Sequence, residues 1–143
     1  MKSLAESVVD WQRVHGRHEL PWQQSREPYP VWVSEIMLQQ TQVATAVPYF
    51  SRFIARFPTV GVLAEASEDE VLGAWSGLGY YGRARNLHRT ARIVAERGWP
   101  DTVDSLETLP GIGRSTAAAI AAFSFGRREA ILDGNVRRVF ARV

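Results

Sequence analysis

The sequence predicts an all-α protein, and three observations support this prediction. Apolar residues recur at three- and four-residue steps along most of the chain, as one face of a helix requires. Strand-like alternation of apolar and polar residues never extends beyond a few positions. The breaks in the helical spacing coincide with glycine and proline, so short loops should join the helices. The composition, with 45% hydrophobic and 22% charged residues among 143, is typical of a globular domain.

In the N-terminal half, amphipathic spacing predicts helices at about residues 3–15, 31–40 and 44–57. Residues 17–30 contain three prolines and should form a loop. Pro58 stops the third helix, because proline cannot continue a helical hydrogen-bond ladder.

In the C-terminal half, Ser67 and the acids that follow it form a capping-box pattern, which predicts a helix start. Gly77 and Gly79 then interrupt the helical spacing. Further helices are expected at about residues 82–97, from Asp104 with Glu107 to Leu109, at 114–125, and from about Asp133 onward.

The residue counts exclude several kinds of chemistry. The sequence has no cysteine, which excludes disulfides and thiolate-held metal or iron–sulfur sites among these residues. The three histidines have no ligand-like spacing. No apolar run approaches membrane-spanning length, and the first ten residues do not resemble a signal peptide. We therefore expect an intracellular protein, in the cytoplasm or nucleoid, that does not contact a membrane.

The basic residues are almost all arginine and are unevenly distributed. Lys2 is the only lysine among 17 basic residues, although the net charge is only +2. No acid occurs from Val71 to Ala95 or from Thr108 to Arg128, and both stretches contain several arginines. Two positive surfaces on a nearly neutral protein are typical of nucleic-acid binding. Ordinary solvated helix faces are the alternative.

The string Leu109-Pro110-Gly111-Ile112-Gly113 lies between two expected helices. Two glycines one residue apart permit a positive-φ turn and a close approach of the backbone to a ligand. The free N–H groups at the start of the next helix then converge on one place, where the helix dipole also attracts an anion. We expect this hairpin to bind a phosphate; an ordinary corner between two helices is the alternative.

Two acids have sequence surroundings that should separate their pKa values. Glu35 is the only acid between Pro28 and Ala64, and burial among its apolar neighbours should raise its pKa and keep it protonated. An exposed helix glutamate is the alternative. Asp133 lies at an expected helix start, where the dipole favours its ionised form; a role as N-cap alone is the alternative. An acid beside an anion is suited to a cationic transition state.

Residues suited to handling a nucleobase surround these acids. The polar run from Leu38 to Gln42 continues from Glu35, and the segment from Gly77 to Tyr81 forms a tight aromatic loop. Aromatic and amide side chains on a loop can fill the gap left by an extruded nucleotide. The alternative is that Tyr80 and Tyr81 are core residues beneath a glycine turn.

Together these residues resemble the helix–hairpin–helix DNA glycosylase superfamily, and most closely its adenine glycosylase branch, the MutY type. The resemblance covers the chain from about Val9 to Val143, with the motifs in family order. The strings that carry it are Leu20-Pro21-Trp22, Val31 to Val43, Gly77 to Tyr81, Arg83 to Leu87, Leu109 to Ala117 and Ile131 to Arg138.

The resemblance implies a hydrolase that removes adenine mispaired with 8-oxoguanine or guanine in double-stranded DNA. It implies that Glu35 protonates the adenine, that Asp133 stabilises the oxocarbenium-like sugar, and that Asn135 supports this network. Further positions match the family's contacts to the extruded base or to the neighbouring helix and its phosphates. With the polar and basic residues of the same motifs, the expected DNA- and base-binding residues are Trp22, Leu38, Gln39, Gln40, Thr41, Tyr80, Arg83, Arg85, Gly111, Gly113 and Arg114.

Ser115 occupies the position at which strand-cleaving members of the superfamily carry a lysine that forms a Schiff base. Serine cannot form one, and Lys2 lies outside this motif, so we expect hydrolysis by water alone, with Ser115 in the catalytic set. Many adenine glycosylases carry tyrosine there. Ala130 replaces a proline frequent before the aspartate loop, which should loosen that loop slightly.

The resemblance also predicts an organisation of the chain. Residues 1–20 would form an N-terminal helix and loop, residues 21–130 a six-helix barrel with the hairpin at 109–113, and residues 131–143 the Asp133 loop and the next helix start. Family members continue into a module with a four-cysteine 4Fe-4S cluster and a C-terminal domain that senses 8-oxoguanine. We therefore expect an N-terminal fragment of a monomeric enzyme, without a cofactor of its own and with an exposed apolar face on its first helix.

Two other functions stay open. A thymine glycosylase for G:T mismatches would have the same fold. A non-catalytic DNA-binding module would use only the hairpin and the arginine faces, and would show salt-sensitive duplex binding without base release.

Overall fold

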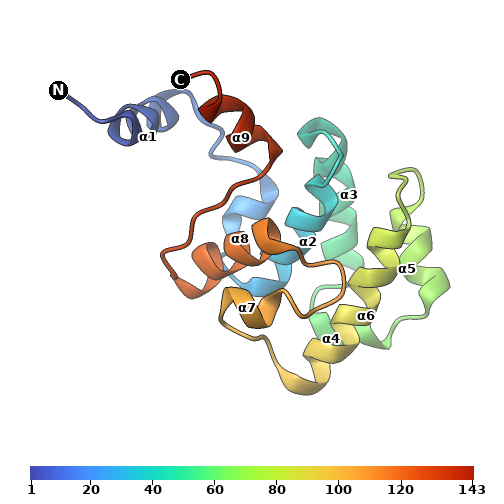
Figure 1. Ribbon diagram of the computed structural model, residues 1–143. Coiled ribbons are helices and arrows are strands. Elements are labelled where there is room, and N and C mark those ends of the chain that lie inside the picture. The colour runs from blue at the N-terminus through green and yellow to red at the C-terminus, as the bar shows by residue number, and fades with distance from the viewer.

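The computed structural model describes residues 1–143 and contains helices and loops but no β-strand, which confirms the all-α prediction (Figure 1). The elements in chain order are α1 (Leu4–His15), the 3₁₀ helix η1 (Pro21–Gln24), α2 (Pro28–Leu38), α3 (Val43–Arg56), α4 (Val60–Glu65), α5 (Glu68–Trp75), α6 (Gly82–Arg97), α7 (Val103–Leu106), α8 (Arg114–Phe125) and α9 (Gly134–Phe140).

Most helices form where the sequence predicts them, and polar caps explain their starts. The bounds of α6 and α8 match the prediction. Ser3 and Glu6 form a complete capping box at the start of α1. Ser67 caps α5 by accepting the backbone N–H of Glu70, but the Glu70 carboxylate does not return the bond, so this predicted capping box is only half formed.

The structure differs from the predictions at three places in the chain. Residues 17–30 are not entirely a loop, because Pro21 and Pro28 each begin a helix, a position where proline's missing N–H leaves no bond unmade. The short helix α4 has no counterpart among the predicted elements. α7 begins after Thr102 rather than at Asp104, because the Thr102 hydroxyl caps it by accepting a backbone N–H at 3.2 Å.

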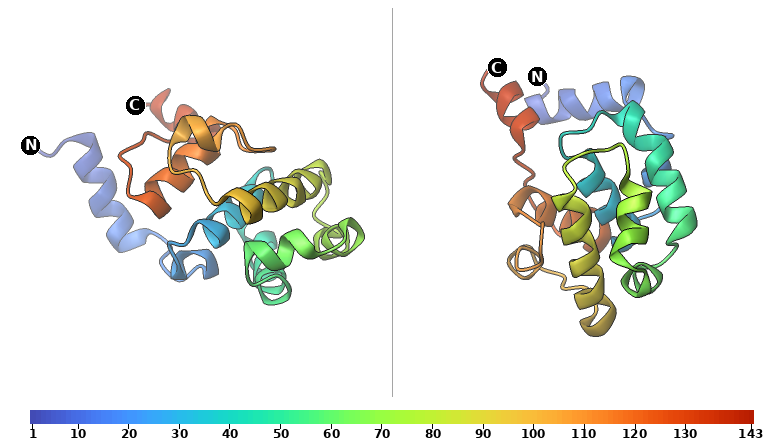
Figure 2. Two further views of the ribbon diagram at one scale, coloured as in Figure 1. Left: turned by 90° about the horizontal axis from the view of Figure 1, so that it is seen from below. Right: turned by 90° about the vertical axis from the view of Figure 1, so that its right-hand side faces the viewer.

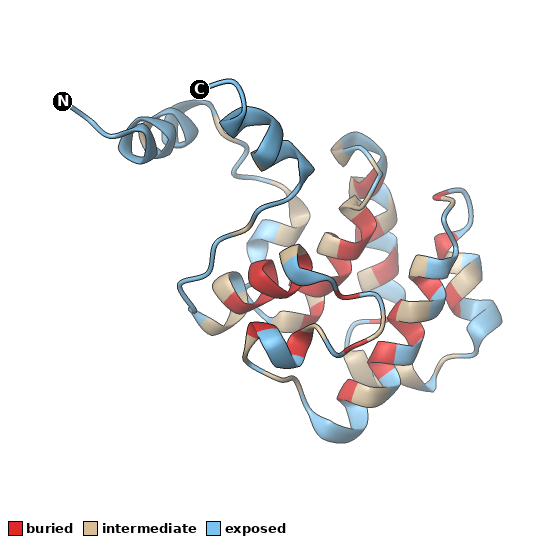
Figure 3. Cartoon of the chain, in the orientation of Figure 1, coloured by how far each residue is buried: buried red, intermediate tan, exposed pale blue.

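The core is built around α2. Its side chains Trp32, Val33 and Met37 are fully buried, and helices α3, α6 and α8 pack against it (Figure 3). Buried alanines on α8, such as Ala117 and Ala121, leave little side-chain bulk between α8 and α2. A polar side chain on α2 therefore reaches solvent only where the surrounding elements leave an opening.

The two terminal helices lie outside this core. Neither α1 nor α9 contains a buried residue, and Leu4, Val8 and Trp11 on α1 are exposed, as the sequence predicts. Figure 2 shows α1 projecting from the body of the molecule, while α9 follows the long loop after α8. None of the helices combines the length and the apolar character that crossing a membrane requires.

Candidate active site

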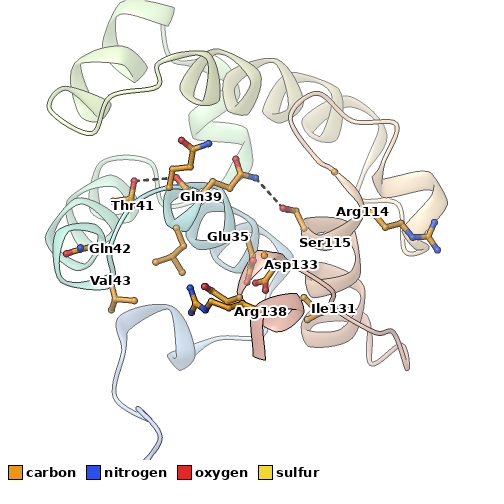
Figure 4. Close-up of a pocket in the computed structure, with 16 residues that line it drawn as sticks. Glu35, Gln39, Thr41, Gln42, Val43, Arg114, Ser115, Ile131, Asp133 and Arg138 are labelled. Atoms are coloured by element: carbon orange, nitrogen blue, oxygen red, sulfur yellow. Dashed lines mark hydrogen bonds between the residues drawn. The ribbon is translucent and has the colours of Figure 1, made fainter. Parts of the chain in front are cut away.

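An open cleft of about 1230 Å³ lies between the C-terminal end of α2, the N-terminal end of α8 and the start of α9 (Figure 4). Eleven of its sixteen lining residues have polar or charged side chains. The lining residues are Glu35, Leu38, Gln39, Gln40, Thr41, Gln42, Val43, Gly113, Arg114, Ser115, Thr116, Ile131, Asp133, Gly134, Asn135 and Arg138. The three residues proposed for catalysis from the two acid motifs, Glu35, Asp133 and Asn135, thus share one cleft with Ser115.

Glu35 lies one turn before the end of α2, where this otherwise buried helix meets the cleft. Its side chain is partly buried. Burial raises its pKa to about 7, and the negative charge of Asp133 adds to this effect. The predicted direction and main cause of the shift are confirmed, and the alternative of an exposed helix glutamate is wrong.

Asp133 is the N-cap of α9 and also faces the cleft. Its Oδ1 accepts the backbone N–H of Val136 at 2.9 Å, which fixes the orientation of the carboxylate. Figure 4 shows its side chain close to that of Glu35. The capping interpretation is therefore correct, but capping is not all that this position provides, because the same carboxylate points toward the acid.

In the hairpin between α7 and α8, only one of the two glycines requires glycine's conformational freedom. Gly111 has φ +76°, and a Cβ there would lie 2.9 Å from Cβ of Asn86. The predicted positive-φ turn is therefore present at Gly111, whereas Gly113 has φ −87°, which any residue adopts. Thr90 on α6 holds the hairpin by donating its hydroxyl to the Pro110 carbonyl oxygen at 2.8 Å.

The N-terminal end of α8 opens directly into the cleft. Gly113 is its N-cap and supplies no side-chain cap, so the first backbone N–H groups of this 12-residue helix have no side-chain acceptor. Gly113, Ser115 and Thr116 all line the cleft. These uncapped donors and the helix dipole together favour an anion at this point.

Two loops beside the cleft contain strained residues. Gln40 (φ +56°) and Tyr80 (φ +48°) are the only residues other than glycine in the left-handed region. Gln40 lines the cleft, whereas Tyr80 lies outside it with 64% of its surface exposed. Tyr81 is 39% exposed, so the alternative that these tyrosines are core residues is wrong.

The remaining predicted binding residues differ in their surroundings. Leu38, Gln39 and Thr41 line the cleft, and Gln39 Nε2 donates to Thr116 Oγ1 at 3.3 Å. Trp22 lies outside the cleft, where its ring packs edge-on against Phe50 with the centroids 5.5 Å apart.

The three predicted binding arginines are not free surface charges. Arg114 pairs with Asp104 at 3.0 Å and with Glu107 at 3.7 Å, and Arg85 Nε lies 3.6 Å from a Glu68 carboxylate oxygen. The Arg83 guanidinium points inward and bonds to backbone carbonyls. Stretches without acids in the sequence therefore do not become surfaces without acids, because folding brings acids from other segments against them.

The cleft also contains residues that the sequence analysis did not select, among them Val43, Thr116, Ile131 and Arg138. Arg138 offers a usable signal, since it follows Asp133 by about one helical turn and a half on the expected last helix. The others adjoin selected residues in the sequence and give no signal of their own.

Comparison with known proteins identifies the relatives of this chain. Residues 33–143 match the family model described as HhH-GPD superfamily base excision DNA repair protein. The chain is 47% identical over 140 residues to the adenine DNA glycosylase of Buchnera aphidicola subsp. Baizongia pistaciae, covering 96% of this chain and 40% of the relative. It is 46% identical over 149 residues to the Homo sapiens adenine DNA glycosylase, covering 96% of this chain and 27% of that one.

Solved structures agree in fold. A thermostable thymine-DNA glycosylase superposes with a TM-score of 0.86 at 25% identity, over 94% of this chain and 64% of that one. Endonuclease III in a non-covalent DNA complex superposes with a TM-score of 0.79 at 22% identity, over 97% and 68%. The chain spans 40% of the length of the Buchnera adenine DNA glycosylase and 27% of that of the human one.

Proposed function

Because this chain belongs to the HhH-GPD superfamily of base excision DNA repair proteins, we propose that its cleft hydrolyses the N-glycosidic bond of an adenine mispaired with 8-oxoguanine or guanine in duplex DNA. The observation that carries the proposal is the juxtaposition of the partly buried Glu35 with Asp133 in one cleft. Identities of 46–47% to curated adenine DNA glycosylases support adenine as the base.

Glu35 acts as the general acid. With a pKa of about 7 it is about half protonated at neutral pH and largely protonated below it, whereas an ordinary glutamate would be ionised. It donates its proton to a ring nitrogen of the extruded adenine. The protonated ring then accepts the electron pair of the glycosidic bond more readily, so the base becomes a better leaving group.

Asp133 stabilises the sugar while the bond breaks. Departure of the base leaves positive charge on C1′ and the ring oxygen, and a carboxylate held by the α9 cap lies beside it. Asn135 supports this carboxylate from the first turn of the same helix. A water molecule then attacks C1′ and its hydroxyl group becomes bonded to the sugar. The proton that this water releases replaces the one that Glu35 gave to the base.

The reaction is hydrolysis without strand cleavage through a lysine. A Schiff base with the sugar requires an amine in the cleft. Ser115 lines the cleft at the relevant motif position, and Lys2 instead pairs with Asp10 on the exposed surface of α1. Ser115 contributes a hydroxyl that can hold the attacking water or a phosphate oxygen.

The DNA backbone binds at the hairpin, where the uncapped N–H groups of α8 attract a phosphate irrespective of sequence. The loops containing Gln40 and Tyr80 fill the gap left by the extruded nucleotide, which their exposure supports.

The residues of this chain do not fit an iron–sulfur cluster. Cysteine thiolates hold such clusters, and the sequence contains no cysteine. No step of the proposed reaction therefore involves a cluster. A 4Fe-4S cluster bound by residues outside this sequence stays a prediction from the family resemblance.

Single-turnover kinetics of the full-length protein on A:8-oxoguanine, A:G and T:G duplexes test the proposal. We expect release of adenine, with Glu35→Gln and Asp133→Asn each lowering the rate at least about 100-fold. Glu96→Gln, which alters an exposed acid on α6, is the control. Wild-type rates in both variants would show that Glu35 is not the general acid and that Asp133 does not stabilise the sugar. Release of thymine alone would favour the G:T enzyme, and salt-sensitive binding without base release would indicate a binding module.

A further inference from the structure

Arg83 lies in the first turn of α6, but its side chain extends inward to the end of α2. Its Nη1 donates to the carbonyl oxygens of Ile36 and Met37, each at 3.0 Å, and also to that of Gln39. These carbonyls belong to the last turn of α2 and its C-cap, where few backbone donors remain, although the Ile36 carbonyl also accepts the Gln39 N–H at 3.2 Å. Glu35 lies in this same turn, directly before Ile36.

The other guanidinium nitrogen reaches two loops. Nη2 donates to Thr41 Oγ1 and to the Gly79 carbonyl oxygen, both at 3.3 Å. The guanidinium carbon lies 5.2 Å from the centroid of the Trp75 ring and 5.7 Å from that of Tyr80. One side chain thus contacts the end of the Glu35 helix, the loop after it, and the aromatic loop before α6.

Both strained residues of the molecule lie next to these contacts. Gln40 lies between Gln39 and Thr41, two of the residues that accept hydrogen bonds from Arg83. Tyr80 directly follows Gly79, another residue that accepts a hydrogen bond from Arg83. A left-handed conformation in a residue other than glycine persists only where its surroundings hold it, and Arg83 is the side chain shared by both loops.

We propose that Arg83 is a positioning residue that clamps the Gln40 loop, the Tyr80 loop and the last turn of the Glu35 helix into one unit. Its consequence for catalysis rests on the proposed function, whereas the clamp itself does not. When the clamp is present, the two loops enter the DNA in a fixed relation to the acid that protonates the extruded base.

An arginine is required because of its geometry. The planar guanidinium donates from two nitrogens in fixed directions, so it can bridge two loops, whereas a lysine ammonium is a single point of donation. The positive charge also suits the negative end of the α2 dipole. Burial lowers the pKa of Arg83, in keeping with a head group removed from solvent.

A direct contact between Arg83 and a DNA phosphate is the competing explanation. The two are separable by salt dependence. Loss of a phosphate contact reduces the slope of log binding constant against log salt by about 0.9. Loss of a clamp leaves this slope unchanged and instead loosens the two loops in the absence of DNA.

The test compares Arg83→Ala and Arg83→Lys with Arg97→Ala in the full-length protein. Arg97 is an exposed residue in the last turn of the same helix and provides a control for the lost charge. Hydrogen exchange without DNA reports on the Gln39, Thr41 and Arg83 amides, which donate to Ile36, Leu38 and Tyr80. Single-turnover excision and the salt dependence of DNA binding complete the measurement.

We expect both Arg83 variants to accelerate exchange in both loops by about tenfold or more, while Arg97→Ala changes neither. The excision rate at saturating enzyme should fall at least tenfold in both Arg83 variants. The fraction of active enzyme and the salt dependence of DNA binding should stay as in the wild type. A merely structural role would lower the active fraction and leave the rate constant of the remaining enzyme unchanged.

The proposal is overturned if exchange in either loop is unchanged, if Arg83→Lys behaves as wild type, or if only the salt slope falls. Should Arg83→Ala not fold, Arg83→Lys alone decides between these outcomes. If the wild-type protein releases no base, the proposed function fails, and the exchange measurement still decides whether the clamp exists.

Discussion

The carboxylate of Asp133 faces Glu35 across the cleft, and its charge adds to the burial that raises the pKa of Glu35 to about 7. The two acids come from different parts of the chain and owe their positions to different constraints. Glu35 lies on the central, largely buried helix α2, while Asp133 is fixed by capping α9. Burial keeps one acid protonated, and the cap aligns the other beside it.

The pH dependence of base excision should report the protonation of Glu35. Because the protonated form is the active acid, the single-turnover rate should be nearly constant below pH 6 and fall about tenfold per pH unit above about 7. The measurement is the excision rate between pH 5 and 9 at saturating enzyme. In Asp133→Asn the midpoint of the residual rate should move toward lower pH, because the charge of Asp133 raises the pKa of Glu35 in the wild type.

The same burial makes Glu35 a cost to stability at alkaline pH. Its pKa is raised from 4.5 to about 7 on folding, so the folded protein binds more protons than the unfolded chain between these values. Stability should therefore fall as pH rises from about 5 to 8, by at most about 3 kcal/mol from this group. Chemical denaturation should show Glu35→Gln to be more stable than wild type at pH 8 and similar at pH 5, although inactive. Equal pH dependence in both proteins would contradict the assignment of the raised pKa.

Sequence patterns identified the features whose physical causes are local. The bounds of α6 and α8 follow from helical spacing between glycine and proline breaks, and the raised pKa of Glu35 follows from its apolar neighbours in one helix. The surroundings of the arginines depend on contacts between distant segments and differ from the predictions. Arg83 reaches the end of α2 from a helix more than 40 positions later, which no local pattern indicates.

Glycine spacing shows the same limit at a single motif. Two glycines one residue apart indicate a tight hairpin, yet only Gly111 adopts a positive φ, and its lack of a side chain is required by Asn86 on α6. The roles of the cleft residues in binding and catalysis stay predictions.

Alanine at each hairpin glycine should separate folding from binding. Gly111→Ala places a Cβ 2.9 Å from Asn86 and requires a left-handed alanine, so we expect destabilisation of about 1–3 kcal/mol. Gly113→Ala meets nothing within 4 Å and has φ −87°, so its thermal stability should be close to wild type. Its methyl group lies at the proposed phosphate site and should weaken DNA binding. Thermal denaturation and duplex binding of the two variants check this; a stable Gly111→Ala protein would contradict the packing argument.

Release of Arg114 from its acidic partners should strengthen DNA binding. Arg114 begins α8 at the cleft, but Asp104 at 3.0 Å and Glu107 at 3.7 Å neutralise its charge. Asp104→Asn removes the nearer carboxylate, and because exposed pairs contribute little to stability, the fold should be unaffected. The freed guanidinium should then lower the duplex Kd about two- to fivefold at low salt, with a steeper salt dependence.

Asp69→Asn, which removes an exposed acid on α5, is the matched control for net charge. The gain should disappear in the double variant with Arg114→Ala; if it persists there, the effect is a general one of net charge and Arg114 is not the residue released.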